Sequence, residues 1–177
     1  MRGTTEQSGG PEIWVRGPVI MESTPEAMNG PAEPSEPVLH QQCAWLSVHG
    51  GAGASTLATL LGGVDIGHRW PDVSRGEPHT VLLVARTHSA GLQAVSQTLD
   101  VFRRGDQPPG VQVAAVVLVA DAPGRLPRAL NQRIKIIGSA IAVHRVPWVA
   151  AWRTGELNGP VPREVTALAH LVTPPSH

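Results

Sequence analysis

The stretch Leu-Ser-Val-His-Gly-Gly-Ala-Gly-Ala-Ser-Thr occupies positions 46–56 and decides the fold expected for this chain. The apolar run 44–48 predicts a buried strand, and the segment 56–61 predicts a short helix. In parallel sheets, a glycine-rich turn from a strand into a helix can direct backbone N–H groups at a phosphate, next to the positive end of the helix dipole. Residues 50–53 therefore predict an anion-binding turn in an α/β fold.

The turn keeps some positions of the phosphate-loop pattern G-x-x-x-x-G-K-[ST] and loses others. Val48 stands at the first glycine, and Ala54 stands at the lysine that contacts the β- and γ-phosphates. Ser55 retains the hydroxyl that binds Mg²⁺ in such loops. We therefore predict a site for ATP or GTP with Mg²⁺, in which Ser55 is the candidate Mg²⁺ ligand. The candidate binding residues are Gly50, Gly51, Ala52, Gly53, Ala54, Ser55 and Thr56.

Short apolar runs alternate with segments of helical periodicity after the turn. Strands are predicted at 80–85, 111–120 and 139–146, with a helix after each of them, the last one over 161–172. This order favours a small three-layer α/β domain of P-loop-like type, whose mainly parallel sheet has about four strands.

The first 40 residues differ in composition from the rest. They contain six prolines, spaced too closely for a helix or a central strand, and six glutamates against two arginines. Residues 41–177 hold twelve basic and eight acidic residues. We expect a disordered Pro/Gly/Glu-rich arm over 1–40, the folded domain over 41–172 and a flexible tail over 173–177.

Composition also excludes several classes of protein. The single cysteine, Cys43, excludes an intrachain disulfide and a zinc site of several thiolates. No apolar run approaches the roughly 20 residues that cross a bilayer, and the first residues lack a signal-peptide pattern. We therefore expect a cytoplasmic protein with no membrane partner.

Residues 46–56 resemble the deviant phosphate loop of the ParA/MinD-type partitioning and positioning ATPases, whose pattern is K-G-G-x-G-K-[ST]-[ST]. The strands and following loops at 81–92 and 116–127 are also similar to that family, as is Val146-Pro147-Trp148. Residues 43–172 resemble, in addition, a family of small actinobacterial proteins labelled as ATP/GTP-binding and found with mobile elements. The resemblance implies a reduced P-loop domain linked to DNA transfer or positioning machinery.

Both lysines of the ParA/MinD pattern are absent. His49 stands at the first and Ala54 at the second, while Lys135, the only lysine, lies far along the chain. Segment 62–80 supplies no evident counterpart of the family's acidic residues. Because such enzymes act mainly by stabilising phosphate charge, we expect a degenerate, non-hydrolytic adaptor or regulator rather than an efficient enzyme. A lysine restored at Ala54 is expected to strengthen triphosphate binding.

Two other functions stay open at this point. One is a divergent ParA/MinD-like NTPase, completed by a partner that supplies the missing cation. The other is a pure protein-interaction scaffold without a ligand. The partner can be an unidentified protein, a second copy of the chain in a homodimer, or DNA.

The loop after the third predicted strand carries further candidates. Asp121 can accept a hydrogen bond from a base amino group, and Arg125 and Arg128 form a candidate partner surface for an acidic protein or a DNA backbone. An Asp-x-Pro-Gly turn with solvated arginines is the competing interpretation. In a weaker alternative, Gly51-Ala52-Gly53 begins a dinucleotide fingerprint and Arg86 meets a 2′-phosphate, but Thr56 occupies the third glycine position.

Overall fold

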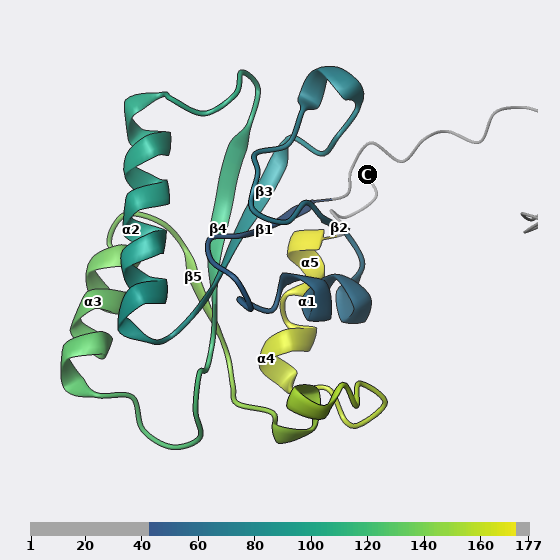
Figure 1. Ribbon diagram of the computed structural model, residues 1–177, viewed down its shortest axis with the longest axis vertical. Helices are drawn as coiled ribbons and strands as arrows, with labels where there is room; N and C mark the ends of the chain where they lie inside the picture. Colours follow the sequence, from purple (N-terminus) through teal and green to yellow (C-terminus); the bar gives the residue numbers. More distant parts are fainter. Residues whose placement is uncertain (1–42, 173–177) are drawn as a thin grey trace, which may run out of the picture. The chain divides into compact units, whose positions relative to one another are not determined.

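The computed structural model describes residues 43–172 of the chain, so the expectations for 1–40 and 173–177 lie outside the described residues. Strands and helices alternate along this region (Figure 1). The strands are β1 Ala44–Ser47, β2 Val64–Asp65, β3 Thr80–Arg86, β4 Gln112–Val119 and β5 Val143–Val146. The α-helices are α1 Ala54–Leu61, α2 Ser89–Arg104, α3 Arg128–Gly138, α4 Arg163–Thr166 and α5 Ala169–Val172, and the 3₁₀ helices are η1 Val73–Arg75 and η2 Ala150–Thr154.

The strands form one five-stranded sheet in the order β2-β1-β3-β4-β5, and every neighbouring pair is parallel. Backbone hydrogen bonds continue past the strand ends, from Val48 N–H to the Val84 carbonyl and from Ala120 N–H to the Val146 carbonyl. All carboxyl ends therefore meet at one edge of the sheet, which we call the carboxyl edge. The turns that leave β1, β3, β4 and β5 gather there.

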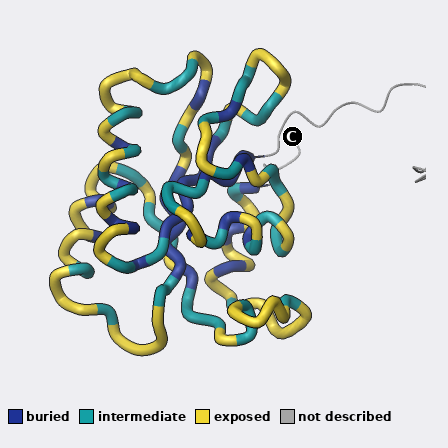
Figure 2. Tube along the Cα trace, in the orientation of Figure 1, coloured by how far each residue is buried: buried dark blue, intermediate teal, exposed yellow. Residues whose placement is uncertain are grey.

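Helices cover both faces of the sheet, which confirms the predicted three-layer α/β architecture. Helices α2 and α3 lie on one face, and α1, α4 and α5 lie on the other (Figure 1). Alternate residues of β3 serve the two layers: Leu82 and Val84 pack with α1 and α4, whereas Leu83 packs with α2. Strands β1 and β3 and the second part of β4 are mostly buried between these layers, whereas β2 and most of β5, at the two edges of the sheet, are not (Figure 2).

The sheet has one strand more than the four expected. Strand β2 has only two residues, too few for a periodic signal, and follows Gly62 and Gly63, both of positive φ. A Cβ added at Gly63 would lie 2.7 Å from Trp45 Nε1, so this turn needs glycine for close packing. These two glycines interrupt the apolar pattern in the sequence, so the strand is not predicted. The same glycines allow the chain to pack closely against β1.

The final helix is also divided. The apolar spacing over 161–172 predicts one helix, but the structure has α4 and α5, joined by hydrogen bonds from Leu168 N–H to Val165 and from Leu171 N–H to Leu168. These hydrogen bonds join residues three positions apart, as in a 3₁₀ helix, and so the backbone between the two helices is wound more tightly than in an α-helix. Within residues 43–172, no helix has the length and apolar composition needed to cross a membrane.

Candidate functional site

The turn between β1 and α1 covers residues 48–53 and begins at the carboxyl edge. Gly51 and Gly53 have φ angles of 69° and 106°, which glycine adopts without steric cost. A Cβ added at Gly50 or Gly51 would meet nothing within 4 Å, so this side of the turn is open. No described residue accepts a hydrogen bond from the backbone N–H groups of residues 49–56. The turn therefore presents a run of unbonded donors beside the N-terminus of α1.

Side chains of the turn have different surroundings. Ala52 and Ala54 are each 1% exposed and belong to the hydrophobic core, so they offer a ligand their N–H groups only. Thr56 lines a cavity, and Ser55 is exposed. The burial of Ala54 argues against the expectation that a lysine at this position reaches a bound phosphate.

An acidic partner of the turn lies in the segment where the sequence suggests none. Asp65 ends β2, and its Oδ2 accepts a hydrogen bond of 2.5 Å from the Ser55 hydroxyl. Its Oδ1 accepts a second bond from Gly67 N–H at 2.9 Å. The sequence does not predict that Asp65 lies beside Ser55, because a strand of two residues leaves no periodic pattern. Only the structure, through the pairing of β2 with β1, shows it.

Ser55 and Asp65 fit a Mg²⁺ ion that is shared with a phosphate ligand. Protein sites for Mg²⁺ commonly supply one or two oxygen ligands, and phosphates and water supply the rest. Residues 43–172 contain no cluster of three or more His, Cys, Asp or Glu side chains able to hold a metal ion. Binding of Mg²⁺ here would therefore depend on the phosphates of the ligand.

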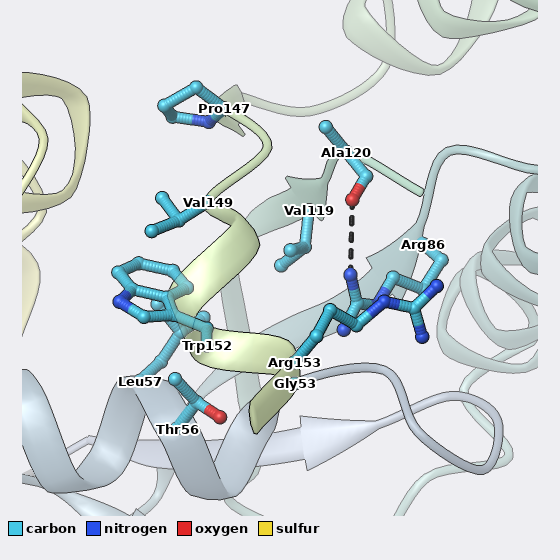
Figure 3. A pocket seen from close by; sticks show the side chains of 10 residues that line it. All are labelled: Gly53, Thr56, Leu57, Arg86, Val119, Ala120, Pro147, Val149, Trp152 and Arg153. Carbon is cyan, nitrogen blue, oxygen red and sulfur yellow. Dashed lines mark hydrogen bonds between the residues drawn. The ribbon is translucent and has the colours of Figure 1, made fainter. Parts of the chain in front are cut away.

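Arg86, at the end of β3, brings a positive charge to the turn. Its Nε donates to the Gly51 carbonyl at 3.1 Å, and its Nη1 donates to the Ala120 carbonyl at 3.0 Å. Figure 3 shows this guanidinium beside that of Arg153, from η2, at the wall of a cavity. Burial lowers the pKa of Arg86, and the nearby charge of Arg153 lowers it further, while Asp121 acts in the opposite direction.

His49 connects the turn to β3 and α2. Its Nε2 accepts a hydrogen bond of 2.9 Å from Arg86 N–H, and its Nδ1 lies 2.9 Å from the Gly50 carbonyl. Both contacts are satisfied by the neutral ring with its proton on Nδ1. The imidazole of His88 lies against it, with ring centroids 4.9 Å apart, and caps α2 by accepting from Gly91 N–H. His49 is thus a structural support of the site, a role its position in the sequence does not reveal.

The groove beyond β4 holds the remaining candidates. Asp121 and Arg125 both line a cavity of about 170 Å³ over the loop after β4. Asp121 is held through its backbone N–H, which donates to the buried hydroxyl of Thr87 at 3.1 Å. Arg128 is exposed at the start of α3 and does not line the cavities described here. The structure thus places Asp121 and Arg125 at one cavity, which Arg128 does not line.

A family model described as "Family of unknown function (DUF6668)" matches residues 42–169. The chain belongs to the DUF6668 family. The search of curated proteins and the search of solved structures found no match. The DUF6668 match includes the glycine-rich turn, Asp65, Arg86 and Arg153.

Some of the residues predicted from the sequence lie close together in this DUF6668 protein. Gly53 and Thr56 share a cavity with Arg86 and Arg153. Asp121 and Arg125 line a neighbouring cavity, and Ala120 lines both cavities. Sequence reasoning missed Asp65, Arg153 and the contacts of His49, since each depends on segments far apart in the chain. For Arg86, only the position after a strand signals a ligand contact.

Proposed function

We propose that this protein binds a phosphate-bearing ligand of the ATP or GTP class with Mg²⁺ and acts as a non-hydrolytic adaptor or regulator. One observation carries the proposal: the backbone N–H groups of residues 49–56 donate to no described residue and surround an open, glycine-rich turn. Unbonded donors at a helix N-terminus favour an anion, because the helix dipole adds to their partial positive charge. Because ATP and GTP are nucleotides of the cytoplasm, we propose that the protein acts in that compartment.

The absence of lysine at the turn supports a role without efficient hydrolysis. Lys135 is exposed on α3, and Ala54 is buried, so no ammonium group reaches the turn from the phosphate-loop position. The carboxylate at the turn, Asp65, is hydrogen bonded to Ser55 and to Gly67. With Ser55 it would hold Mg²⁺, which neutralises phosphate charge when bound. We therefore expect binding with negligible turnover.

The partner in this proposal meets Arg125 and Arg128. Both side chains are exposed, and neither forms an ion pair with another described residue. Arg125 lines the groove over the β4 loop, so a ligand in that groove would alter the surface that a partner contacts. An acidic protein surface or a DNA backbone has the complementary charge.

Calorimetric titration of the full chain with ATP, GTP, ADP and GDP in the presence of Mg²⁺ tests the proposal. We expect saturable binding of at least one nucleotide and no measurable release of phosphate. Gly53→Val should abolish binding, because φ of 106° excludes a β-branched residue and the turn must change shape.

Gly105→Val is the matched control. Gly105 also has positive φ, at 77°, but it ends α2 at the opposite edge of the sheet. This variant carries similar backbone strain and should retain the affinity of the wild type. If neither the wild-type chain nor Gly105→Val binds any of the four nucleotides, the adaptor has no nucleotide ligand and the scaffold function takes its place.

A further inference from the structure

Two arginines share a small cavity beside the glycine-rich turn. Arg86 comes from the end of β3 and Arg153 from η2, and both line the cavity together with Gly53 and Thr56 of the turn (Figure 3). The cavity is small, with a volume of about 30 Å³. Its lining brings two guanidinium groups next to the backbone of the glycine-rich turn.

Neither arginine is neutralised within the described chain. The four ion pairs of this part of the molecule involve Arg69, Arg103, Arg104 and Arg163, so no carboxylate lies within 4 Å of Arg86 or Arg153. Arg153 rests against the ring of Trp148, with its guanidinium carbon 4.9 Å from the ring centroid. Two like charges at one cavity repel each other, and an anion between them would remove that repulsion.

Hydrogen bonds orient the guanidinium of Arg86 but do not use all of its N–H donors. Its Nε and Nη1 donate to the Gly51 and Ala120 carbonyls, which fixes the plane of the group. Nη2 donates to no described residue, so it retains donors for a ligand. Half-burial makes the lack of a counter-ion costly, because carbonyl oxygens compensate a buried charge only in part.

We propose that Arg86 and Arg153 jointly bind one terminal phosphate group of the ligand and supply the positive charge that Ala54 cannot. This inference rests on the proposed function, since the turn contacts the same ligand. Because both guanidinium groups line one small cavity, a single phosphate group can contact them together. Guanidinium groups suit this role because each can donate two parallel hydrogen bonds to phosphate oxygens.

The test uses pyrophosphate, which carries terminal phosphates without a base or a sugar. Binding to the full chain is measured by calorimetry with Mg²⁺ present, for the wild type, Arg153→Gln, Arg86→Lys and the double variant. Arg153→Gln should weaken binding about tenfold or more, the scale of losing charge-assisted hydrogen bonds. Arg86→Lys keeps the charge but loses the pair of parallel N–H donors of the guanidinium, so it should weaken binding as well.

The double variant should bind only slightly more weakly than the weaker single variant, because both arginines act on one phosphate. Arg75→Gln is the matched control: it removes an exposed arginine of η1 that does not line the cavity, and it should bind within about twofold of the wild type. Thermal unfolding verifies that each variant is folded. Since Arg153 is exposed and donates no hydrogen bond to a described residue, Arg153→Gln decides the matter even if Arg86→Lys does not fold.

Gly53→Val, measured in parallel, separates the two proposals. If Gly53→Val abolishes pyrophosphate binding while both arginine variants bind like the wild type, the arginine site is overturned and the turn site stands. If the arginine variants lose binding while Gly53→Val retains it, the arginine site stands and the turn site is overturned. Absence of pyrophosphate binding in the wild type overturns the arginine site, whereas the nucleotide titration decides the proposed function.

Discussion

Two arginines, Arg69 and Arg86, illustrate two different uses of the same side chain. Arg69 lies in the connection 66–79 between β2 and β3 and donates through Nη1 and Nη2 to both carboxylate oxygens of Glu77, at 2.6 and 2.5 Å. Glu77 accepts a further bond from Asp72 N–H at 2.7 Å. Arg86, at the carboxyl edge, has only carbonyl acceptors and faces a second arginine.

The difference separates a structural charge from a charge available for binding. The Arg69–Glu77 pair uses the donors of one group and the acceptors of the other, so it orders the connection and offers little to a ligand. Arg86 is oriented by its carbonyl bonds and remains without a counter-ion in the described chain. An unpaired, half-buried cation beside unbonded N–H groups is a stronger indication of a ligand site than either feature alone.

The largest effect is expected for Ala54→Lys, which places a cation at the turn by a different route. Ala54 is 1% exposed and belongs to the core between α1 and the sheet. A lysine there must therefore bury the methylene groups of its side chain or displace α1. Overpacking of a core costs about 1–3 kcal/mol, and an unpaired buried ammonium adds to that cost. We expect a loss of about 3 kcal/mol or more in the free energy of unfolding, measured with urea.

Ser55→Lys is the control for Ala54→Lys, because the neighbouring position is exposed. It should change the free energy of unfolding by less than half as much. The opposite result would be an Ala54→Lys variant that has wild-type stability and binds triphosphate more tightly. It would support the expectation drawn from the sequence, that a lysine at this position contacts phosphate, and the charges of Arg86 and Arg153 would no longer be required for binding.

Ala54 also shows how far the sequence determines this site. Apolar runs alternating with helical periodicity identify the layers of the fold, because strands buried on both faces are continuously apolar. The glycines identify the turn for a similar local reason. The environment of Ala54 depends instead on how α1 packs on the sheet, and the pairing of Ser55 with Asp65 depends on a two-residue strand. Contacts of that kind leave no periodic trace in the chain.

Gly91→Ala should disturb the carboxyl edge and leave the β2–β3 connection unchanged. A Cβ at Gly91 would lie 2.3 Å from the Arg86 carbonyl oxygen and 2.9 Å from His49 Nε2, so the start of α2 must move away from β3. We expect a loss of about 1–3 kcal/mol in the free energy of unfolding, typical of overpacking. Backbone amide shifts should change at Arg86 and His49 but not at Arg69.

Ser89→Ala, at the exposed first residue of α2, is the control for Gly91→Ala. It should stay within about 0.5 kcal/mol of the wild type, as is usual for surface substitutions. A Gly91→Ala variant as stable as Ser89→Ala would show that α2 does not pack as closely against β3 as the structure has it.

His49→Ala should loosen the support of Arg86 without adding any atoms. It removes the acceptor of Arg86 N–H and leaves that donor unpaired, which costs about 1–2 kcal/mol. Amide hydrogen exchange should accelerate at Arg86 in this variant, while the amide of Asp72, which donates to Glu77, should exchange as in the wild type. His49→Gln offers another acceptor and should recover part of the protection. Equal exchange at Arg86 in all three proteins would contradict the bond to His49.

The smallest effect is expected at the Arg69–Glu77 pair, because both side chains are accessible to solvent, which screens their interaction. The hydrogen bond from Arg69, with that from Asp72 N–H, lowers the pKa of Glu77 from 4.5 to about 2. The folded state therefore binds this proton more weakly than the unfolded state. The stabilisation is complete above pH 4.5 and is lost as the pH falls towards 2.

Glu77→Gln should remove this contribution, so the difference in unfolding free energy between wild type and variant should be constant above pH 4.5 and shrink between pH 4.5 and 2. Urea unfolding at several pH values measures it, and Glu164→Gln, at an exposed carboxylate of α4, corrects for the change in net charge. A difference that stays the same down to pH 2 would mean that Glu77 is not paired in the folded protein. Arg69 would then be as unpaired as Arg86, and the contrast between a structural and a ligand-binding arginine would no longer hold.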